Sequence, residues 1–445
     1  MNKRLPKNVH LSQTHFYRFP GGDLRKKKWP TDKLTIHWGN TRQGTTLDRL
    51  GASHFLLMGA TRYGKTTLLH LLMKSVLCTG NLEYPLRYRA LINDPKQEWY
   101  KLLRRWALED QHIIVANPFD KRSSAWDLAA DLTSPTRVAD FVEDLCEAFS
   151  AGSEQQRHQE SVFWRNIAKE TLNAIVAAFQ EVSPNDWDLR DLVCCALDAD
   201  AREQALNITP IGRGIWSDYF SLEGTHSQIP GGAKATLRNV LQQYAPTAAL
   251  WHRAKSKFTF KDWKRRGAII LLGYNREAEQ HTQPTNYLLL KAAAQRVLNS
   301  ADTQEDLSWF CLDEIASIGA TPKLIELLNM GASRGARVAI TALGFGNLKS
   351  AFPNSIESEE IIASTTNKAL VRLEHHDDRR IAKEQLGSFW TKAITQNQTS
   401  DPDGYNSWSF SDVERFRFEI EDLLGQERPE NGIDAIVQTA GQIPW

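Results

Sequence analysis

One short segment carries the residue types that hold the phosphates of a nucleotide. It matches the pattern G-x-x-x-x-G-K-[ST], in which two glycines let the backbone turn tightly and point several N–H groups inward. The predicted cofactor-binding residues are the whole of this loop and the turn after it: Gly59, Ala60, Thr61, Arg62, Tyr63, Gly64, Lys65, Thr66 and Thr67. Lys65 is expected to reach the β- and γ-phosphates, and the Thr66 hydroxyl to complete the Mg²⁺ shell. The loop therefore predicts binding of ATP and Mg²⁺.

The residues on either side of the loop decide how much weight the pattern deserves. An apolar run before Gly59 predicts a strand, and apolar residues at helical spacing after Thr67 predict a helix. The positive end of that helix would add to the attraction for a polyphosphate. A glycine-rich turn without a ligand is the alternative, but the two flanks are the context that a phosphate-binding loop requires.

Two adjacent carboxylates, Asp313 and Glu314, form the second chemical pattern. They follow residues 307–312, an apolar run that predicts a strand. Asp313 is expected to sit beside Mg²⁺ or to accept a hydrogen bond from a Mg²⁺-bound water, and Glu314 to orient the water that attacks the γ-phosphate. A solvated turn or a helix start would explain the pair without catalysis. Together with the loop upstream, we interpret the pair as catalytic and favour a hydrolase over a small-molecule kinase.

An arginine is a further candidate for catalysis. In ring ATPases the neighbouring subunit contributes an arginine that stabilises the charge of the transition state. Arg334 and Arg337 lie about twenty residues beyond Glu314 and could take this role. A surface arginine without any such task is an equally good explanation.

The order of predicted elements indicates an α/β fold. Strands at 90–94 and 113–115 alternate with a helix at 98–106, which is typical of a parallel sheet covered by helices. Residues 134–244 show mostly helical spacing, and strands return after them. We therefore divide the chain into a basic arm with a short β segment (1–50), a nucleotide-binding domain (51–133 and 245–445) and an inserted all-α domain (134–244).

Composition and charge narrow the function classes. The 445 residues are 41% hydrophobic and 24% charged, as in ordinary globular proteins, and no apolar run is long enough for a membrane span. The N-terminus lacks the apolar core of a signal peptide, and the five cysteines show no metal-binding spacing. The first 33 residues carry nine Lys/Arg and two acids, so this arm could contact nucleic acid or anionic lipid, or simply be solvated.

Several further segments resemble one family. Residues 94–98 read D-P-K-Q-E, and residues 312–319 read L-D-E-I-A-S-I-G. Both resemble segments of type IV secretion coupling proteins of the TraG/TraD class, relatives of the FtsK and HerA DNA pumps. The N-P…W-D-L segment at 117–128 and the F-W…A-K-E-T-L segment at 163–172 are similar to further elements of that class, and the likeness runs from about residue 37 to the C-terminus.

This resemblance implies a RecA-like P-loop NTPase with a mostly parallel central sheet, flanking helices and an inserted all-α domain. It further implies a homohexameric ring with ATP between subunits and DNA threaded through a central channel. The all-α domain would meet relaxase or secretion-channel proteins. Basic clusters such as Lys255 with Lys257, and Lys264 to Arg266, are candidates for contacts with DNA phosphates, although most such clusters are merely solvated.

The sequence departs from the family pattern at three places. The usual N-terminal pair of membrane helices is not seen, so we expect a cytoplasmic protein that reaches the inner membrane only through a partner or the basic arm. Leu343 stands where the family usually has a glutamine near the γ-phosphate, with Asn347 a few residues on. Ala332 stands where an arginine is usual, which makes Arg334 the nearest substitute.

Two functions of different classes follow. The favoured one is an ATP-dependent DNA translocase, a coupling ATPase that moves DNA or a nucleoprotein in conjugative transfer or a related DNA-mobilising system. The alternative is an ATP-gated DNA-binding or adaptor switch, in defence or transposition, without processive translocation. Leu343 motivates the alternative because an aliphatic side chain cannot hydrogen-bond a phosphate.

Overall fold

The computed structural model of the chain describes residues 54–78, 88–150, 159–221, 229–303, 306–318, 322–352, 354–397, 407–416 and 434–438. It also describes three two-residue strands before them, β1 (Tyr17–Arg18), β2 (Thr35–Ile36) and β3 (Thr45–Thr46). Apart from these strands, the predicted basic arm lies outside the described residues.

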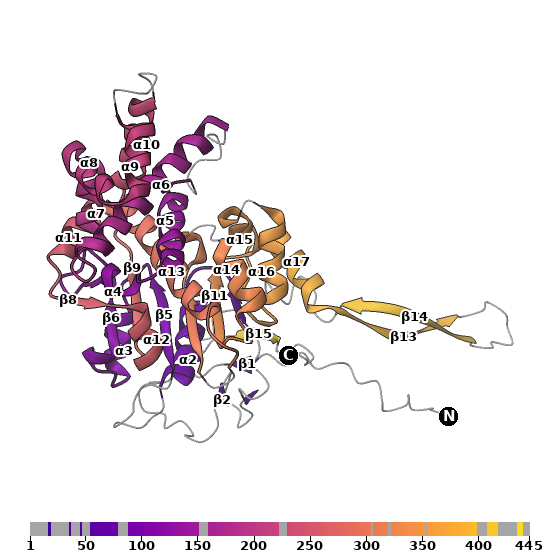
Figure 1. Cartoon of the computed structure of the whole chain (residues 1–445). Helices are drawn as coiled ribbons and strands as arrows, with labels where there is room; N and C mark the ends of the chain where they lie inside the picture. Colours follow the sequence, from indigo (N-terminus) through magenta and orange to yellow (C-terminus); the bar gives the residue numbers. More distant parts are fainter. Residues whose placement is uncertain are drawn as a thin grey trace.

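A nine-stranded sheet forms the centre of the molecule, in the order β1-β15-β12-β4-β11-β10-β5-β9-β6 (Figure 1). The seven strands from β12 to β6 run parallel to one another. They are β4 (Phe55–Met58), β5 (Arg89–Asp94), β6 (Ile113–Val115), β9 (Ile269–Gly273), β10 (Ser308–Leu312), β11 (Ala336–Ala342) and β12 (Asn367–Leu370). Of the described strands in this sheet, only β15 (Asp434–Gln438) and β1 run antiparallel to their neighbours. The predicted α/β class with a mostly parallel sheet is confirmed.

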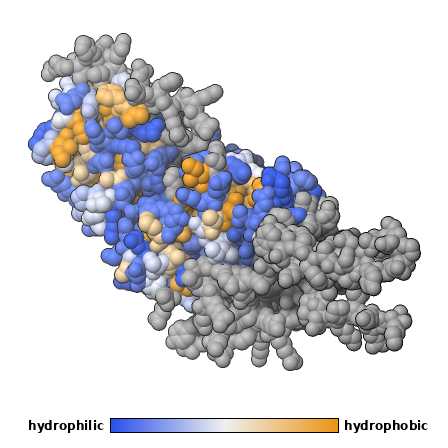
Figure 2. Space-filling view, turned by 90° about the vertical axis from the view of Figure 1, so that its right-hand side faces the viewer, coloured by the Kyte–Doolittle hydropathy of each residue, from blue (hydrophilic) through white to orange (hydrophobic). Residues whose placement is uncertain are grey.

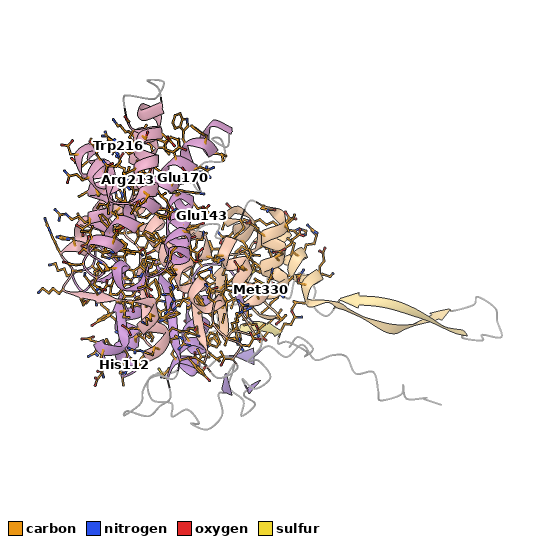
Figure 3. The ribbon with its side chains drawn as sticks, in the orientation of Figure 1. His112, Glu143, Glu170, Arg213, Trp216 and Met330 are labelled. Carbon is orange, nitrogen blue, oxygen red and sulfur yellow. The ribbon has the colours of Figure 1, made fainter. Side chains whose placement is uncertain are left out.

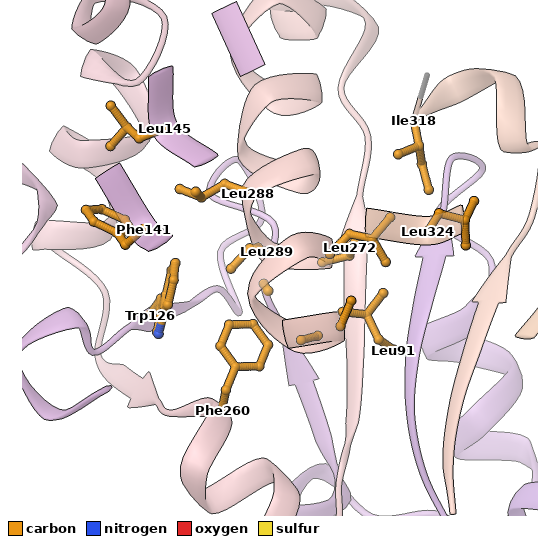
Figure 4. Packing of buried hydrophobic residues seen from close by; sticks show 14 of the residues in the cluster. Leu91, Trp126, Phe141, Leu145, Phe260, Leu272, Leu288, Leu289, Ile318 and Leu324 are labelled. Atoms are coloured by element: carbon orange, nitrogen blue, oxygen red, sulfur yellow. The ribbon is translucent and has the colours of Figure 1, made fainter. Parts of the chain in front are cut away.

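The central strands are buried along their whole length because both faces of the sheet are covered. In β4, Phe55 and Leu57 join the hydrophobic core on one face, while Leu56 and Met58 join the core on the other. The first core contains α2 (Lys65–Leu77) and α3 (Trp99–Arg105). The second core, part of which Figure 4 shows, contains residues of the following helices. They are α12 (Phe260–Arg266), α13 (Glu279–Leu298), α14 (Pro322–Met330), α15 (Phe345–Ala351), α16 (Ser355–Ser364) and α17 (His376–Leu386).

Among its described residues, the region predicted to be all-α contains helices and short connections but no strand, and it stands at the top of Figure 1. It lies between β7 (Ser124–Trp126) and β8 (Ser256–Phe258), which pair in parallel. Its helices are α4 (Leu128–Asp131), α5 (Pro135–Ser150), α6 (Gln159–Val182), α7 (Leu189–Leu197), α8 (Ala199–Ile208), α9 (Pro210–Tyr219), α10 (Ile229–Gln242) and α11 (Ala245–His252). Because one core runs from these helices into the sheet, the limits 134 and 244 stay an interpretation.

A long β-hairpin was not predicted. Strands β13 (Ser388–Asn397) and β14 (Ser407–Phe416) pair along ten residues each and extend away from the body of the molecule (Figure 1). Single 3-10 turns occur at η2 (Asp110–His112), η4 (Arg276–Ala278) and η5 (Ile315–Ser317).

The surface shown in Figure 2 is largely hydrophilic, with separate hydrophobic patches. Within the described part of the chain, every helix is too short or too polar to cross a bilayer.

Candidate nucleotide-binding site

The predicted phosphate-binding loop leaves β4, in the middle of the sheet, and ends at the start of α2. Two hydrogen bonds hold the loop to the neighbouring strand ends: Gly59 N donates to the Ala342 carbonyl (3.3 Å), and Ala60 N donates to the Arg372 carbonyl (2.8 Å). Gly59 has a φ of 149°, and a Cβ there would lie 2.1 Å from Val371 Cγ2. Only glycine therefore lets the chain turn this close to the strand end beside it.

The start of α2 is open to an anion. Its N-cap residue, Gly64, has a φ of 100° and supplies no side-chain hydrogen bond, and the first turn of the helix contains no acid. The first N–H groups of the helix and its positive end therefore lack a counter-charge from their own turn. A triphosphate would supply one, so the residues present fit the predicted ligand.

Lys65 is buried with its charge only partly balanced. The ammonium Nζ donates to the Gly59 carbonyl at 2.5 Å, and the side chain is 8% exposed. Burial lowers the pKa of Lys65 to about 8. The nearby Glu314 carboxylate opposes this shift, and the positive charge of Lys96 adds to it. A bound phosphate would add the negative charge that this ammonium lacks.

Asp313 and Glu314 lie at the same edge of the sheet as the loop. They follow β10, and only β11 separates β10 from β4. With strands about 4.8 Å apart, the two motifs are about 10 Å from each other across the sheet. Thr341 of β11 joins the acids, because its hydroxyl donates to Asp313 Oδ1 (2.8 Å) and accepts from Glu314 N (2.8 Å). The fold thus brings both predicted halves of the site together.

The metal-ligand candidates also meet at this edge. Thr66 is half-buried in the first turn of α2, and Asp313 is 3% exposed. Burial raises the pKa of Asp313, and the Thr341 hydrogen bond and the Lys96 charge oppose that effect. A hydroxyl and a carboxylate are the oxygen donors that suit Mg²⁺, which would neutralise phosphate charge when bound. The positions of Thr66 and Asp313 fit a shared Mg²⁺ ion, and their roles as its ligands stay predictions.

The D-P-K-Q-E segment supports the site from the next strand, β5. Lys96 Nζ lies 3.1 Å from Glu314 Oε1, with both side chains about 40% exposed. Asn93 Nδ2 donates to the Asp313 carbonyl (2.8 Å), and the Asp94 carboxylate accepts from the backbone N of Glu98 and of Trp99 (3.0 Å each) at the start of α3. The motif was recognised in the sequence, but these roles of Lys96 and Asn93 were missed.

Leu343, the residue in place of the usual glutamine, lies beside the loop. It follows the end of β11 directly and is 41% exposed, and its N–H donates to Asn347 Oδ1 (3.3 Å). Another group at this edge was not predicted: the Arg372 guanidinium lies 5.1 Å from the centre of the Tyr63 ring and pairs with Glu374 (2.8 Å). No motif in the sequence marked Arg372.

The arginine candidates lie at the opposite edge of the sheet. Arg334 precedes β11, in the turn after α14, whose last residue Met330 is labelled in Figure 3. Its Nη1 donates to the Leu298 carbonyl. Arg337 is 3% exposed and donates to the carbonyls of Ala332 and Ala336. Within one chain neither reaches the phosphate-binding loop, so a catalytic role of Arg334 requires a second subunit and stays a prediction.

Comparisons with known proteins identify the family of the chain. A family model, described as the type IV secretion-system coupling protein DNA-binding domain, matches residues 46–413. The chain belongs to this family. A search among curated proteins finds no significant match.

Solved structures of a coupling protein share the fold. The chain is similar to the bacterial conjugative coupling protein TrwBdeltaN70 in its unbound form, with a TM-score of 0.68, 16% identity, and coverage of 97% of this chain and 91% of that one. It is also similar to the plasmid coupling protein TrwB in complex with ADP and Mg²⁺ (TM-score 0.64, 16% identity, 96% and 92% covered). A TrwB complex with a non-hydrolysable ATP analogue is similar to the same degree (TM-score 0.65, 16% identity, 96% of this chain and 91% of that chain covered). At this identity the likeness confirms the fold of this coupling-protein family member.

Proposed function

We propose that this coupling protein is an ATPase that hydrolyses ATP to move DNA, or DNA with an attached protein, in conjugative transfer or a related DNA-mobilising system. The observation that carries the proposal is that Lys65 lies at the same sheet edge as Asp313 and Glu314, the two acids that Thr341 holds together. The family match over residues 46–413 and the nucleotides named in the TrwB complexes support it.

The chemistry proposed for the site follows from its groups. The open N-terminus of α2 and the Lys65 ammonium would hold the phosphates, and Thr66 and Asp313 would hold Mg²⁺, which supplies charge neutralisation. The Glu314 carboxylate would orient the attacking water. Glu314 has a φ of 52°, a strained backbone conformation for a residue other than glycine, and Thr341 holds its N–H in that position.

The proposal includes an oligomer. We infer a homohexameric ring in which Arg334 of one subunit reaches the nucleotide of the next, because within its own chain Arg334 lies at the far edge of the sheet. Its guanidinium would have to leave the Leu298 carbonyl to do so. DNA would pass through the ring, and relaxase or secretion-channel proteins would bind the helical region. Attachment to the inner membrane would come through a partner or the basic N-terminal arm.

The test measures ATP hydrolysis and DNA movement separately. The wild-type protein should hydrolyse ATP faster with DNA present and should displace the third strand of a DNA triplex in one direction. Glu314→Gln should retain nucleotide binding and lose both activities. Glu359→Gln, an exposed glutamate on α16, is the matched control and should behave as wild type.

Two results would argue against the motor. A ring seen by negative stain whose hydrolysis ignores DNA would exclude a DNA-driven cycle. Nucleotide-dependent DNA binding without triplex displacement would instead favour the ATP-gated switch. This switch is the second candidate function because the exposed Leu343 beside the loop cannot hydrogen-bond a phosphate.

A further inference from the structure

A cavity of about 300 Å³ lies between α5 of the helical region and helices α12 and α13. It is separate from the nucleotide site: α12 leads into the start of β9 and α13 ends ahead of β10, so the cavity lies toward the amino ends of the strands. The phosphate-binding loop is at their carboxyl ends. A volume of this size is at the lower end of the range for small-molecule pockets.

One wall of the cavity is aromatic. Trp126 packs edge to face against Phe141, with ring centres 5.7 Å apart, and against Phe260 at 5.2 Å. Figure 4 shows these three side chains gathered between the helices. Leu132 and Ala292 extend the apolar lining. This wall would shield the hydrocarbon or aromatic body of a ligand from water.

Two arginines line the cavity from different elements, Arg137 on α5 and Arg296 on α13. Arg137 Nη1 donates to the Asp131 carbonyl (3.2 Å). The guanidinium of Arg296 has no hydrogen bond or ion pair to any residue that the structure describes. Burial lowers the pKa of Arg296, the nearby charge of Arg137 lowers it further, and the Asp131 carboxylate opposes both effects. Two like charges in a partly buried place are costly unless anions balance both of them.

Most other charged groups of the cavity are already engaged. Asp131 accepts hydrogen bonds from Trp126 Nε1 (2.9 Å) and from two backbone N–H groups, those of Phe260 (2.5 Å) and Lys261 (3.2 Å). Asp144 lies 2.6 Å from Lys291 Nζ, and Lys264 lies 3.1 Å from Asp306. Asp140 accepts only a long hydrogen bond from Gln295 (3.5 Å). The unused hydrogen-bonding capacity is therefore that of the guanidinium donors and of the Asp140 carboxylate.

We propose that this cavity binds an apolar monocarboxylate, with its carboxylate between Arg137 and Arg296 and its body against Trp126 and Phe141. A carboxylate fits better than a phosphate because Asp131, Asp140 and Asp144 also line the cavity and would repel a dianion more strongly than a monoanion. Planar carboxylates also match the two-pronged donors of arginine. The ligand would join α5 of the helical region to α13 of the sheet region.

Titration calorimetry tests this with three probes of different bodies: octanoate, 3-phenylpropionate and indole-3-propionate. Saturating ADP and Mg²⁺ are present throughout, and the titration is repeated with Lys65→Ala, so that the result does not depend on the nucleotide site. At least one probe should bind one to one. Its uncharged amide should bind roughly ten times more weakly or worse, because it loses the charge-assisted hydrogen bonds.

Variants locate the binding. Arg296→Met should weaken it at least about tenfold. Arg265→Met is the matched control, because Arg265 is 64% exposed and pairs with Asp262 outside the cavity lining. Ala292→Phe, which fills the cavity, should abolish binding with the circular dichroism spectrum unchanged. The proposal is overturned if no probe binds the wild-type protein, if the amide binds equally well, or if Arg296→Met binds as tightly as wild type.

Discussion

Two buried lysines, Lys65 in the nucleotide site and Lys291 between α13 and α5, differ in how the protein balances their positive charge. Their exposed fractions are nearly the same, 8% and 6%, and two carboxylates lie near each of them. Lys291 Nζ lies 2.6 Å from Asp144 and 2.6 Å from Glu147. These ion pairs outweigh the effect of burial and raise the pKa of Lys291. At Lys65 burial prevails, and the pKa falls to about 8.

The difference comes from which groups bind the nearby carboxylates. At the nucleotide site Thr341 binds Asp313, and Lys96 pairs with Glu314, so among the described residues Lys65 bonds only to a backbone carbonyl. At the α5–α13 contact both acids bind the lysine directly. A lysine that completes a folded contact has its counter-charges in the protein, whereas a lysine that binds a phosphate leaves its counter-charge to the ligand.

Replacing Lys65 should produce the largest effect. We expect Lys65→Ala to reduce ATP hydrolysis by at least about 100-fold, or about 2.7 kcal/mol of transition-state stabilisation. The melting temperature should not fall, because the protein loses a buried charge that lacks a direct ionic partner. Steady-state hydrolysis and calorimetric melting measure the two quantities. Lys101→Ala, at an exposed position on α3, is the control. A large fall in melting temperature with Lys65→Ala would contradict the contrast with Lys291.

Replacing Lys291 should do the reverse. Lys291→Ala leaves Asp144 and Glu147 without their cation, which should reduce the free energy of unfolding by about 3 kcal/mol. Glu147 is 37% exposed and regains some hydration, so the loss should stay at the lower end for buried pairs. Urea unfolding measures it, with the exposed Lys349→Ala as control.

A compensating variant sharpens this test. Lys291→Met combined with Asp144→Asn and Glu147→Gln removes all three charges and should recover most of the lost stability. If the triple variant were as unstable as Lys291→Ala, the loss would come from side-chain packing, and the ionic interpretation of this contact would be wrong.

The same two lysines show what the sequence could and could not predict. Lys65 was predicted because its neighbours are local: glycines at fixed spacing, an apolar strand before them and a helix after. Lys291 was not, because its partners on α5 lie far away in the chain and only the folded structure brings them together. Thr341 was missed for the same reason, since a threonine in a buried strand has no local pattern. Arg334 is close to Glu314 in the sequence but not in the fold. Their spacing did not reveal that Arg334 precedes β11 and therefore lies at the opposite edge of the sheet.

Removing the Thr341 hydroxyl tests the link between the acids. Thr341→Val keeps the shape of this fully buried side chain but loses the hydrogen bonds to Asp313 and Glu314. We expect hydrolysis to fall about tenfold and the free energy of unfolding by about 1–2 kcal/mol. Thr341→Ser keeps the hydroxyl and should retain most of the activity. Full activity in Thr341→Val would show that the acids keep their positions without this residue.

The pH dependence of nucleotide affinity should reflect Lys65 with a definite sign. In the free protein the pKa of Lys65 is lowered to about 8, and the charges of bound phosphates should raise it again. The bound state then holds the proton more tightly than the free state, so binding takes up a proton above about pH 8. Affinity for ADP and Mg²⁺ should be constant from about one unit below that pH downward and fall as the pH rises, by up to about tenfold per unit.

Calorimetry in two buffers of different ionisation enthalpy measures this uptake directly, with about half a proton expected at pH 8 and nearly one at pH 9. Lys65→Met removes the titrating group and should abolish the uptake, whereas Lys291→Met should not, because the ion pairs keep that lysine protonated throughout this range. An affinity that stays flat between about pH 7.5 and 9.5 would mean that Lys65 remains charged without its ligand. Both buried lysines would then be charged in the free protein, and the contrast between them would be wrong.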